Sequence, residues 1–332
     1  MAKKLDKNLI FLQSEDCRAR IKDLAAALKK SSPLTKYSMG QLEKEGIIKN
    51  PYCIFDYSYF GLILFKVYFK GGYIGEKDKS KIISTLSDNQ YVVSIYELAG
   101  EYDLAVEILS PNPSRFNKEL KKIIDEFPTL NNHKITLNMV TYIYPPTFLL
   151  DDPELAKRVK SYIVIGGDRP VEQFDKSEMG VIKCLLENPR IRFTHLAKKA
   201  NMNVNTAKKI LKKLRDKKII RGYKYTIDTG KLYIYKYRIF IKLHNMSQEK
   251  EEQLKEIFLM TKGVTSMNKI VGDWNLELDV ESLEKTTVRQ LITKIREDFK
   301  DVIENFNIME YYDTYKKKFL PSYLFFQEPA VI

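Results

Sequence analysis

Lysine side chains cluster in the stretch 204–217, shortly after two asparagines. An α-helix here would place Ala207, Leu211 and Leu214 on one face, because these positions lie three and four residues apart. The opposite face would carry amide, hydroxyl and ammonium groups, from Asn205, Thr206, Lys208, Lys209, Lys212 and Lys213. Asn and Lys can donate to base edges and Lys also pairs with phosphates, so this face predicts a contact with double-stranded DNA.

The residues on either side of this helix predict the element that would position it. A short helix is expected over 191–200, followed by a polar turn, 201–203, in which Asn203 caps the next helix and adds to the candidate DNA-contacting residues. An extended segment is expected from Ile219 to Asp228. Two helices, a turn and a strand predict a winged helix-turn-helix, whose second helix enters the major groove.

The chain of 332 residues consists of two halves with similar sequences. A shift of 172 positions aligns the two halves without a gap from residue 10 to residue 299. Identical pairs include Arg18/Arg190, Leu24/Leu196, Ala25/Ala197, Ile47/Ile219, Asp56/Asp228, Gly100/Gly272, Leu104/Leu276 and Phe127/Phe299. One register held over that length indicates a tandem duplication.

The first copy of the module has a weaker reading helix. Ser32 is expected to cap it and Pro33 to stand in its first turn. Gly40 in its middle costs roughly 1 kcal/mol of helix propensity relative to Ala. Thr35, Met39 and Leu42 would face inward. Its candidate DNA-contacting residues are Ser32, Lys36, Tyr37 and Gln41. Fewer charges predict a supporting role or a looser sequence preference.

After its helical part, each half follows the order strand, helix, strand, strand, helix, strand. The expected strands of the first half are 62–70, 91–98, 102–109 and 134–144, with helices at 77–86 and 115–127. This order is the ferredoxin-like βαββαβ arrangement. The predicted fold class is therefore α+β, with two copies of a winged helix-turn-helix followed by an αβ sandwich. The expected domains are 1–55, 56–150, a linker 151–171, 172–228 and 229–332.

Charge and composition narrow the function classes. The net charge is +13. Residues 175–225 contain fifteen Lys and Arg against four Asp and Glu, about +11, and residues 1–55 contain eleven against six, about +5. The basic excess thus lies entirely on the helical modules, as a DNA-binding surface requires. No apolar run is long enough for a transmembrane span. Three cysteines outside any CxxC spacing argue against a disulfide framework, a metal site and an oxidising compartment.

These motifs resemble the Lrp/AsnC (feast/famine) transcription regulators, over nearly the whole chain and twice. The helix-turn-helix pattern consists of Leu24-Ala25, Ser31, Met39, Leu42-Glu43 and Gly46-Ile47-Ile48, and of Leu196-Ala197, Asn203, Leu211, Leu214 and Ile219-Ile220. The Gly-x-x-Asp turn of the family's sandwich is similar to Gly100–Asp103 and Gly272–Asn275. The resemblance implies promoter DNA as partner, self-association through the sandwiches, and an amino acid or related effector near Gly100, Asp103, Gly272 and Asn275. No cofactor is implied, and a cytoplasmic, archaeal setting is expected.

Departures from the family pattern leave alternatives open. Asn275 replaces the acid, so the second effector site has lost a charge, and both glycines could simply serve a hairpin. Sirohaem decarboxylases share a related two-module architecture, but their turn carries a histidine where this chain has Gly100 or Gly272. A third possibility is a ligand-sensing assembly module that does not bind DNA. No paired carboxylates, Ser/His/Asp set or Gly-rich phosphate loop is present, so no enzyme activity is expected.

Overall fold

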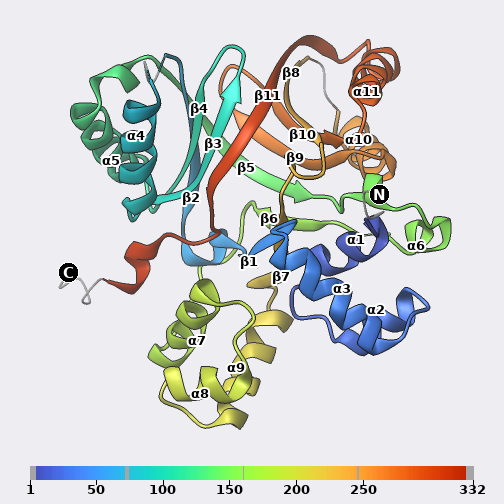
Figure 1. Cartoon of the computed structure of the whole chain (residues 1–332). Coiled ribbons are helices and arrows are strands. Elements are labelled where there is room, and N and C mark those ends of the chain that lie inside the picture. Colours follow the sequence, from blue (N-terminus) through green and yellow to red (C-terminus); the bar gives the residue numbers. More distant parts are fainter. Residues whose placement is uncertain (1–4, 72–74, 160, 245–246, 327–332) are drawn as a thin grey trace.

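A computed structural model describes residues 5–71, 75–159, 161–244 and 247–326 (Figure 1). The helices and strands of the first half, in chain order, are α1 (Lys7–Glu15), α2 (Ile21–Ala27), α3 (Ser32–Lys44), β1 (Ile48–Phe55), β2 (Ile63–Phe69), α4 (Glu76–Asp88), β3 (Val92–Ala99), β4 (Leu104–Ser110), α5 (Pro113–Glu126) and β5 (His133–Ile143). The βαββαβ order expected from the sequence is thus confirmed in the first half, with boundaries displaced by one or two residues.

The second half repeats this order after a structured connection. The segment 151–171 holds a short helix, α6 (Pro153–Arg158), and a strand, β6 (Ile163–Gly166), neither of which the sequence suggested. The remaining elements are α7 (Lys176–Glu187), α8 (Phe193–Lys199), α9 (Val204–Asp216), β7 (Ile220–Ile227), β8 (Tyr235–Leu243), α10 (Gln248–Met260), β9 (Val264–Val271), β10 (Leu276–Ser282), α11 (Lys285–Asp298) and β11 (Ile303–Lys317).

The two ferredoxin-like sheets join at both of their edges. Each has four antiparallel strands, in the order β5-β2-β4-β3 and β11-β8-β10-β9. Strand β11 then pairs with β3, and β5 pairs with β9. These eight strands form a closed ring, to which β6 adds beside β5. Closure leaves the eight strands without a free sheet edge, so the halves associate within one chain.

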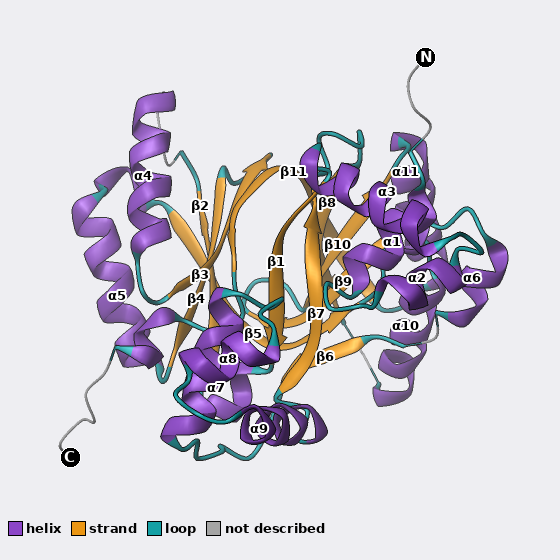
Figure 2. Ribbon diagram, turned by 60° about the horizontal axis from the view of Figure 1, so that its bottom comes forward, coloured by secondary structure: helices purple, strands orange, loops and turns teal. Residues whose placement is uncertain are grey.

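Helices cover only the outside of this ring. Figure 2 shows α4 and α5 on one side and α10 and α11 on the other, with the strands between them. Outward positions of β2, such as Phe65, pack under these helices; the Phe65 and Phe116 rings stack with centroids 4.0 Å apart. Inward positions, such as Lys66 and Tyr68, face the opposite sheet instead of solvent, and both are at most 2% exposed. The molecule therefore has a polar interior between two apolar layers.

A two-stranded ribbon connects the helical modules to the ring. Strand β1 pairs antiparallel with β7, so the strand following each reading helix pairs with its counterpart from the other half. Two backbone hydrogen bonds show the same correspondence between the halves. The Asp56 N–H donates to the Ile219 carbonyl at 2.9 Å, and the Asp228 N–H donates to the Ile47 carbonyl at 2.8 Å. Since 56 and 47 lie 172 positions before 228 and 219, these bonds mark an approximate two-fold axis relating the halves.

No helix in the described ranges is long and apolar enough to cross a membrane.

Candidate nucleic-acid interface and interior cavity

The reading helix of the second module is α9, and its local sequence explains where it starts and which face it buries. The Asn203 side chain accepts a hydrogen bond from the Thr206 backbone N–H at 2.8 Å, which caps the helix. Ala207, Leu211 and Leu214 are buried, as their spacing predicts. Asn203 thus has a structural role at the position where the sequence also suggested DNA contact.

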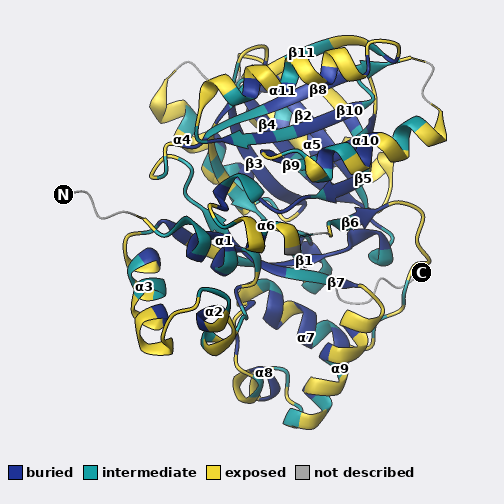
Figure 3. Cartoon of the chain, turned by 90° about the vertical axis from the view of Figure 1, so that its right-hand side faces the viewer, coloured by how far each residue is buried: buried dark blue, intermediate teal, exposed yellow. Residues whose placement is uncertain are grey.

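The outward face of α9 is open. Asn205, Lys208, Lys209 and Lys212 are exposed, and Thr206 is half-buried. The Lys208 ammonium lies 5.8 Å from the centre of the Phe193 ring, at the start of α8. Figure 3 shows α8 and α9 at the end of the molecule farthest from the ring of strands, where no other described helix or strand lies over their outer side. The amide and three ammonium groups are therefore free to meet a ligand as large as a DNA duplex.

Lys213 differs from its neighbours on α9. Its ammonium lies 2.5 Å from a carboxylate oxygen of Glu178, whose side chain is only 5% exposed. Glu178 also forms the capping box of α7 with Asp175. The Glu178 hydrogen bond raises the pKa of Lys213. Lys213, whose side chain is 53% exposed, therefore links α9 to α7, and the DNA contact expected of it stays a prediction.

Helix α3, the reading helix of the first module, begins one residue earlier than expected. Ser31, not Ser32, is the cap, and its hydroxyl accepts from the Leu34 N–H. Pro33 stands in the first turn as expected, where its missing N–H would have no partner within the helix. Ser32 and Lys36 are exposed and Gln41 is half-buried. Leu34 and Tyr37 are 51% and 59% exposed, so this surface is more apolar than that of α9.

Left-handed backbone occurs at matching places in the two modules. Lys29 and its counterpart Asn201 end the first helix of each helix-turn-helix with φ of 54° and 50°. Gly46 and its counterpart Lys218 follow the reading helices with φ of 66° and 60°. Lys29 and Lys218 therefore occupy conformations that glycine or asparagine adopts more readily.

The two Gly-x-x-Asp-like turns lie at the seams where the sheets join. Gly100 has φ of 130°, and a Cβ there would stand 3.4 Å from Met309 of β11. Gly272 has φ of 153°, and a Cβ there would stand 3.2 Å from Thr136 of β5. Backbone conformation and the close approach of the opposite half both favour glycine at these turns.

Asp103 and Asn275 perform the same structural task. An Asp103 carboxylate oxygen accepts a hydrogen bond from the Gly71 backbone N–H. The Asn275 side-chain oxygen accepts from the Leu243 N–H at 2.9 Å. Gly71 and Leu243 are counterparts in the duplication. An amide oxygen replaces a carboxylate oxygen here without loss of that bond, which explains why the acid can change to Asn.

Buried charges meet between the sheets, and sequence analysis missed them. Glu277 is fully buried; its carboxylate lies 2.6 Å from the Lys66 ammonium and 3.1 Å from the Arg238 guanidinium. The Tyr68 hydroxyl donates to it at 2.5 Å, and the Asn268 amide at 3.2 Å. Each oxygen of this carboxylate therefore has a partner, as a buried charge requires. Charged residues alternating with Val, Ile and Leu along these strands were the available signal, and they would ordinarily indicate a solvent-facing side.

A second buried pair stabilises the same interior. The Arg238 guanidinium contacts Asp279 with a bidentate geometry, at 2.8 and 3.1 Å. Burial alone would raise the pKa of Asp279, but the adjacent Arg238 charge lowers it well below its usual value. Both groups therefore stay ionised at neutral pH.

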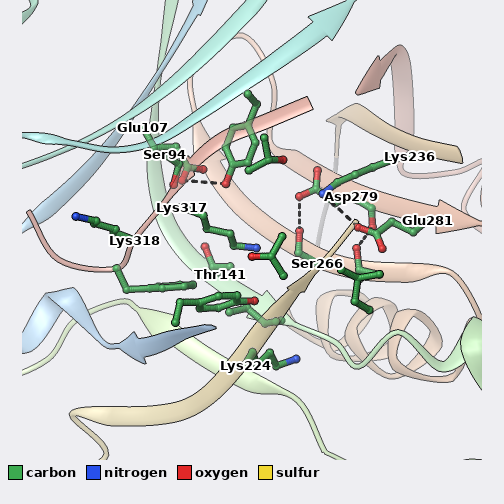
Figure 4. Close-up of a pocket in the computed structure, with 18 of the residues that line it drawn as sticks. Ser94, Glu107, Thr141, Lys224, Lys236, Ser266, Asp279, Glu281, Lys317 and Lys318 are labelled. Carbon is green, nitrogen blue, oxygen red and sulfur yellow. Dashed lines mark hydrogen bonds and ion pairs between the residues drawn. The ribbon is translucent and has the colours of Figure 1, made fainter. Parts of the chain in front are cut away.

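A cavity of about 350 Å³ opens beside these charges, between the β1–β7 ribbon and the inner faces of the sheets. Figure 4 shows side chains from both halves around it. Its lining includes Tyr52, Ser94, Lys224, Lys236, Ser266 and Lys317. None of Gly100, Asp103, Gly272 and Asn275 lines it. The effector-site candidates inferred from the sequence and this cavity are thus separate places.

Comparison with known proteins identifies relatives of the helical modules and of longer stretches of the chain. Residues 3–49 and 174–221 both match the family described as winged helix-turn-helix DNA-binding. The transcriptional activator DecR of Escherichia coli is 23% identical over 133 residues, covering 40% of this chain and 88% of DecR. The regulator FL11 of Pyrococcus horikoshii is 27% identical over 124 residues, covering 36% of this chain and 78% of FL11.

One solved structure resembles the chain over nearly its full length. The sirohaem decarboxylase NirDL superposes with a TM-score of 0.57 and 14% identity, covering 96% of this chain and 94% of NirDL. This likeness shows a shared duplicated fold.

Two matches to a DNA-binding family and a barrel built from paired sandwiches define a double winged helix-turn-helix DNA-binding protein. Both helical modules match a winged helix-turn-helix DNA-binding family and the chain is similar to transcription regulators, in agreement with the resemblance seen in the sequence, and one chain supplies both halves of the duplicated fold.

Proposed function

We propose that this protein regulates transcription by binding an asymmetric double-stranded DNA site, with α9 as the main reading helix and α3 as the supporting one. The exposed, lysine-bearing face of α9 is the observation that supports this most directly. Asn205 and Thr206 in the first turn would reach base edges, and Lys208, Lys209 and Lys212 would meet base edges or phosphates. Lys36, Tyr37 and Gln41 would make the weaker contacts of α3.

The test measures DNA affinity as a function of salt, on a site selected from a random pool. The double variant Lys209→Ala/Lys212→Ala should reduce the slope of log K against log salt by about 2, since each lost phosphate contact changes it by about 0.9. Lys118→Ala/Lys121→Ala removes two exposed lysines of α5, which lies outside the helix-turn-helix modules, and is the matched control. Equal slopes for the two double variants would refute the assignment of α9.

We also propose an amino-acid effector at the first seam, with Asp103 binding its ammonium group. Asp103→Asn tests this without disturbing the turn, because Asn275 already makes the equivalent backbone hydrogen bond in the second half. The variant should keep its melting temperature and lose any shift of DNA affinity caused by amino acids. An unchanged response would exclude Asp103 from effector binding.

A second candidate function is decarboxylation of a tetrapyrrole, supported by the full-length fold likeness to NirDL and by the interior cavity. We favour the non-enzymatic function, because none of His133, His195 and His244 lines that cavity. Titration with sirohaem separates the two: a shifted Soret band together with loss of CO₂ would support the enzyme, and an unchanged spectrum would exclude it.

A further inference from the structure

The interior cavity lies on the approximate two-fold axis, because residues 172 positions apart line it together. Lys66 and Arg238, Glu107 and Asp279, and Ser94 and Ser266 are such pairs. In an assembly of two identical chains, the two walls of this cavity would be the same. The duplication removes that restriction, and the two walls have become different.

Where the two walls differ, the first half tends to supply apolar or aromatic side chains and the second half polar ones. At five pairs of matching lining positions, a side chain dominated by ring or hydrocarbon in the first half corresponds to a charged or polar one in the second: Leu64/Lys236, Leu109/Glu281, Tyr52/Lys224, Tyr96/Asn268 and Tyr57/Thr229. The aromatic wall is held in place by packing, since the Tyr52 ring stacks on Phe319 with centroids 5.7 Å apart. A ligand that fits must have an apolar side and a polar side.

The charges of the polar wall leave one half-buried cation uncompensated. Lys224 pairs with Glu15 at 2.7 Å, and Lys236 pairs with Glu281 at 3.2 Å. Lys317, at the end of β11, has no carboxylate within ion-pair distance in the part of the chain described here. Its ammonium lies 5.3 Å from the centre of the Tyr52 ring. A cation–π contact of this kind offsets only part of the cost of removing an ammonium from water.

The close-up view places this cation at the cavity. Figure 4 shows the Lys317 side chain pointing inward between Thr141 and Ser266, whereas Lys318 points away. The Ser266 hydroxyl donates to Asp279 at 2.9 Å, so this part of the wall is fixed. Lys317 is thus positioned to bind an anionic group beside an aromatic surface.

We propose that this cavity binds a small aromatic carboxylate, with its ring against the first-half wall and its carboxylate on Lys317. The volume of about 350 Å³ falls in the range of small-molecule sites. The ribbon formed by β1 and β7 provides Tyr52 and Lys224 and also joins the two reading modules. A bound ligand therefore changes the affinity for DNA, an effect that rests on the proposed function.

The first experiment measures binding alone, by equilibrium dialysis of the full chain with 2-naphthoate and with its neutral analogue 2-naphthamide. One 2-naphthoate should bind per chain, at least tenfold more tightly than the amide. Lys317→Met should remove this preference, and Lys318→Met, the matched control, should keep it. Tyr52→Ser should weaken both compounds equally, because it removes ring contact and no charge. Absence of naphthoate binding, or a preference that survives Lys317→Met, would overturn the proposal.

The second experiment measures DNA affinity of each variant with and without saturating 2-naphthoate. The native chain should change its affinity at least fivefold and Lys317→Met should not, since coupling between sites requires differential binding. An unchanged affinity in a chain that binds naphthoate would overturn the coupling. Absence of DNA binding under all conditions would refute the proposed regulator while leaving the dialysis result standing.

Discussion

At the scale of single residues, two cations of the duplication meet on the two-fold axis. Lys66 and Arg238 are counterparts, and so are their acids Glu107 and Asp279, at 3.5 and 2.8 Å. Both cations also contact Glu277. The counterpart of Glu277 is Ala105, so only one half supplies this acid. A single carboxylate between two cations requires that the halves differ, which a duplicated chain permits.

Glu277→Gln should therefore destabilise the protein strongly. It leaves Lys66 and Arg238 close together, both about 2% exposed, with one fewer negative charge between them. Loss of one partner from a buried pair costs about 3–5 kcal/mol. Urea denaturation followed by circular dichroism measures the change. Glu281→Gln, which removes a partly exposed acid 3.2 Å from Lys236, is the control and should cost about 1 kcal/mol or less. Similar losses in the two variants would contradict this interpretation.

Lys316 predicts a pH dependence of stability. Burial, with a contribution from nearby Lys318, lowers its pKa to about 8. Between pH 8 and the unfolded value near 10.4, this lysine binds more protons in the unfolded chain than in the native one, so Lys316 contributes a rise of stability with pH. The gain is at most about 1.4 kcal/mol per pH unit from this group. Burial also raises the pKa of the Cys17, Cys53 and Cys184 thiols and raises that of Tyr52 to about 12; these groups lower the stability of the native state as pH rises, so the contribution of Lys316 is taken from the comparison with a variant that lacks it.

Lys316→Met should remove this rising contribution, so between pH 8 and 9.5 its stability should change less favourably with pH than that of the native protein, by at most about 1.4 kcal/mol per pH unit. Lys121→Met, a change at an exposed lysine of α5, should leave the profile unchanged. Denaturation midpoints at four pH values would decide this, and parallel profiles for native protein and Lys316→Met would show that Lys316 does not titrate in this range.

Sequence alone could predict residues whose surroundings are local. Asn203 caps α9 as expected, since a cap depends only on the next three residues. Ser31 is the cap of α3 where Ser32 was expected, a difference of one residue between two adjacent serines that can both cap a helix. Lys317 and Glu277 could not be recognised, because their partners lie on strands distant in sequence, and a charged residue on an alternating strand usually faces solvent.

At the scale of elements, the lysines of helix α9 are expected to differ in role: Lys212 contacts DNA, and Lys213 stabilises the packing of α9 on α7. Lys212 is exposed, whereas the Lys213 ammonium lies 2.5 Å from Glu178 of α7. Lys212→Ala should reduce the salt slope of DNA binding by about 0.9 and leave the melting temperature unchanged. Lys213→Ala should lower the melting temperature and change the slope less. Salt titrations and thermal melts of the two single variants test this, and a larger slope change in Lys213→Ala would reverse the assignment.

The periodic patterns of the sequence were sufficient for most helices and strands, including all four strands of each sandwich. Strand β6 was not anticipated, because its four residues, Ile163–Gly166, are too short to show alternation. The strand after each reading helix was expected to act as a wing of its own module. Its partner is instead the counterpart strand of the other half, a choice that no local pattern encodes.

At the scale of the whole molecule, the single chain joins two duplicated halves whose sequences have diverged. The closed ring of strands fixes the sandwiches against each other at two seams, and the ribbon fixes the modules against the ring. The two halves differ at three places. Helix α9 carries more lysines than α3, the second-half lining of the cavity is more polar than the first-half lining, and Glu277 corresponds to Ala105. Because its two halves present different surfaces, the molecule is not expected to prefer a ligand with two identical halves.

The DNA site should therefore be asymmetric, with unequal half-sites about one helical turn apart. Footprints on DNA selected from a random pool should show strong protection at one half-site and weak protection at the other. Lys209→Ala/Lys212→Ala should weaken overall affinity at least tenfold and erase the strong half, because α9 provides most of the charge. Lys36→Ala/Gln41→Ala, the matched change on α3, should lower affinity about threefold or less and affect only the weak half. A palindromic site with equal losses from both double variants would mean that the two modules read DNA equivalently, despite their different surfaces.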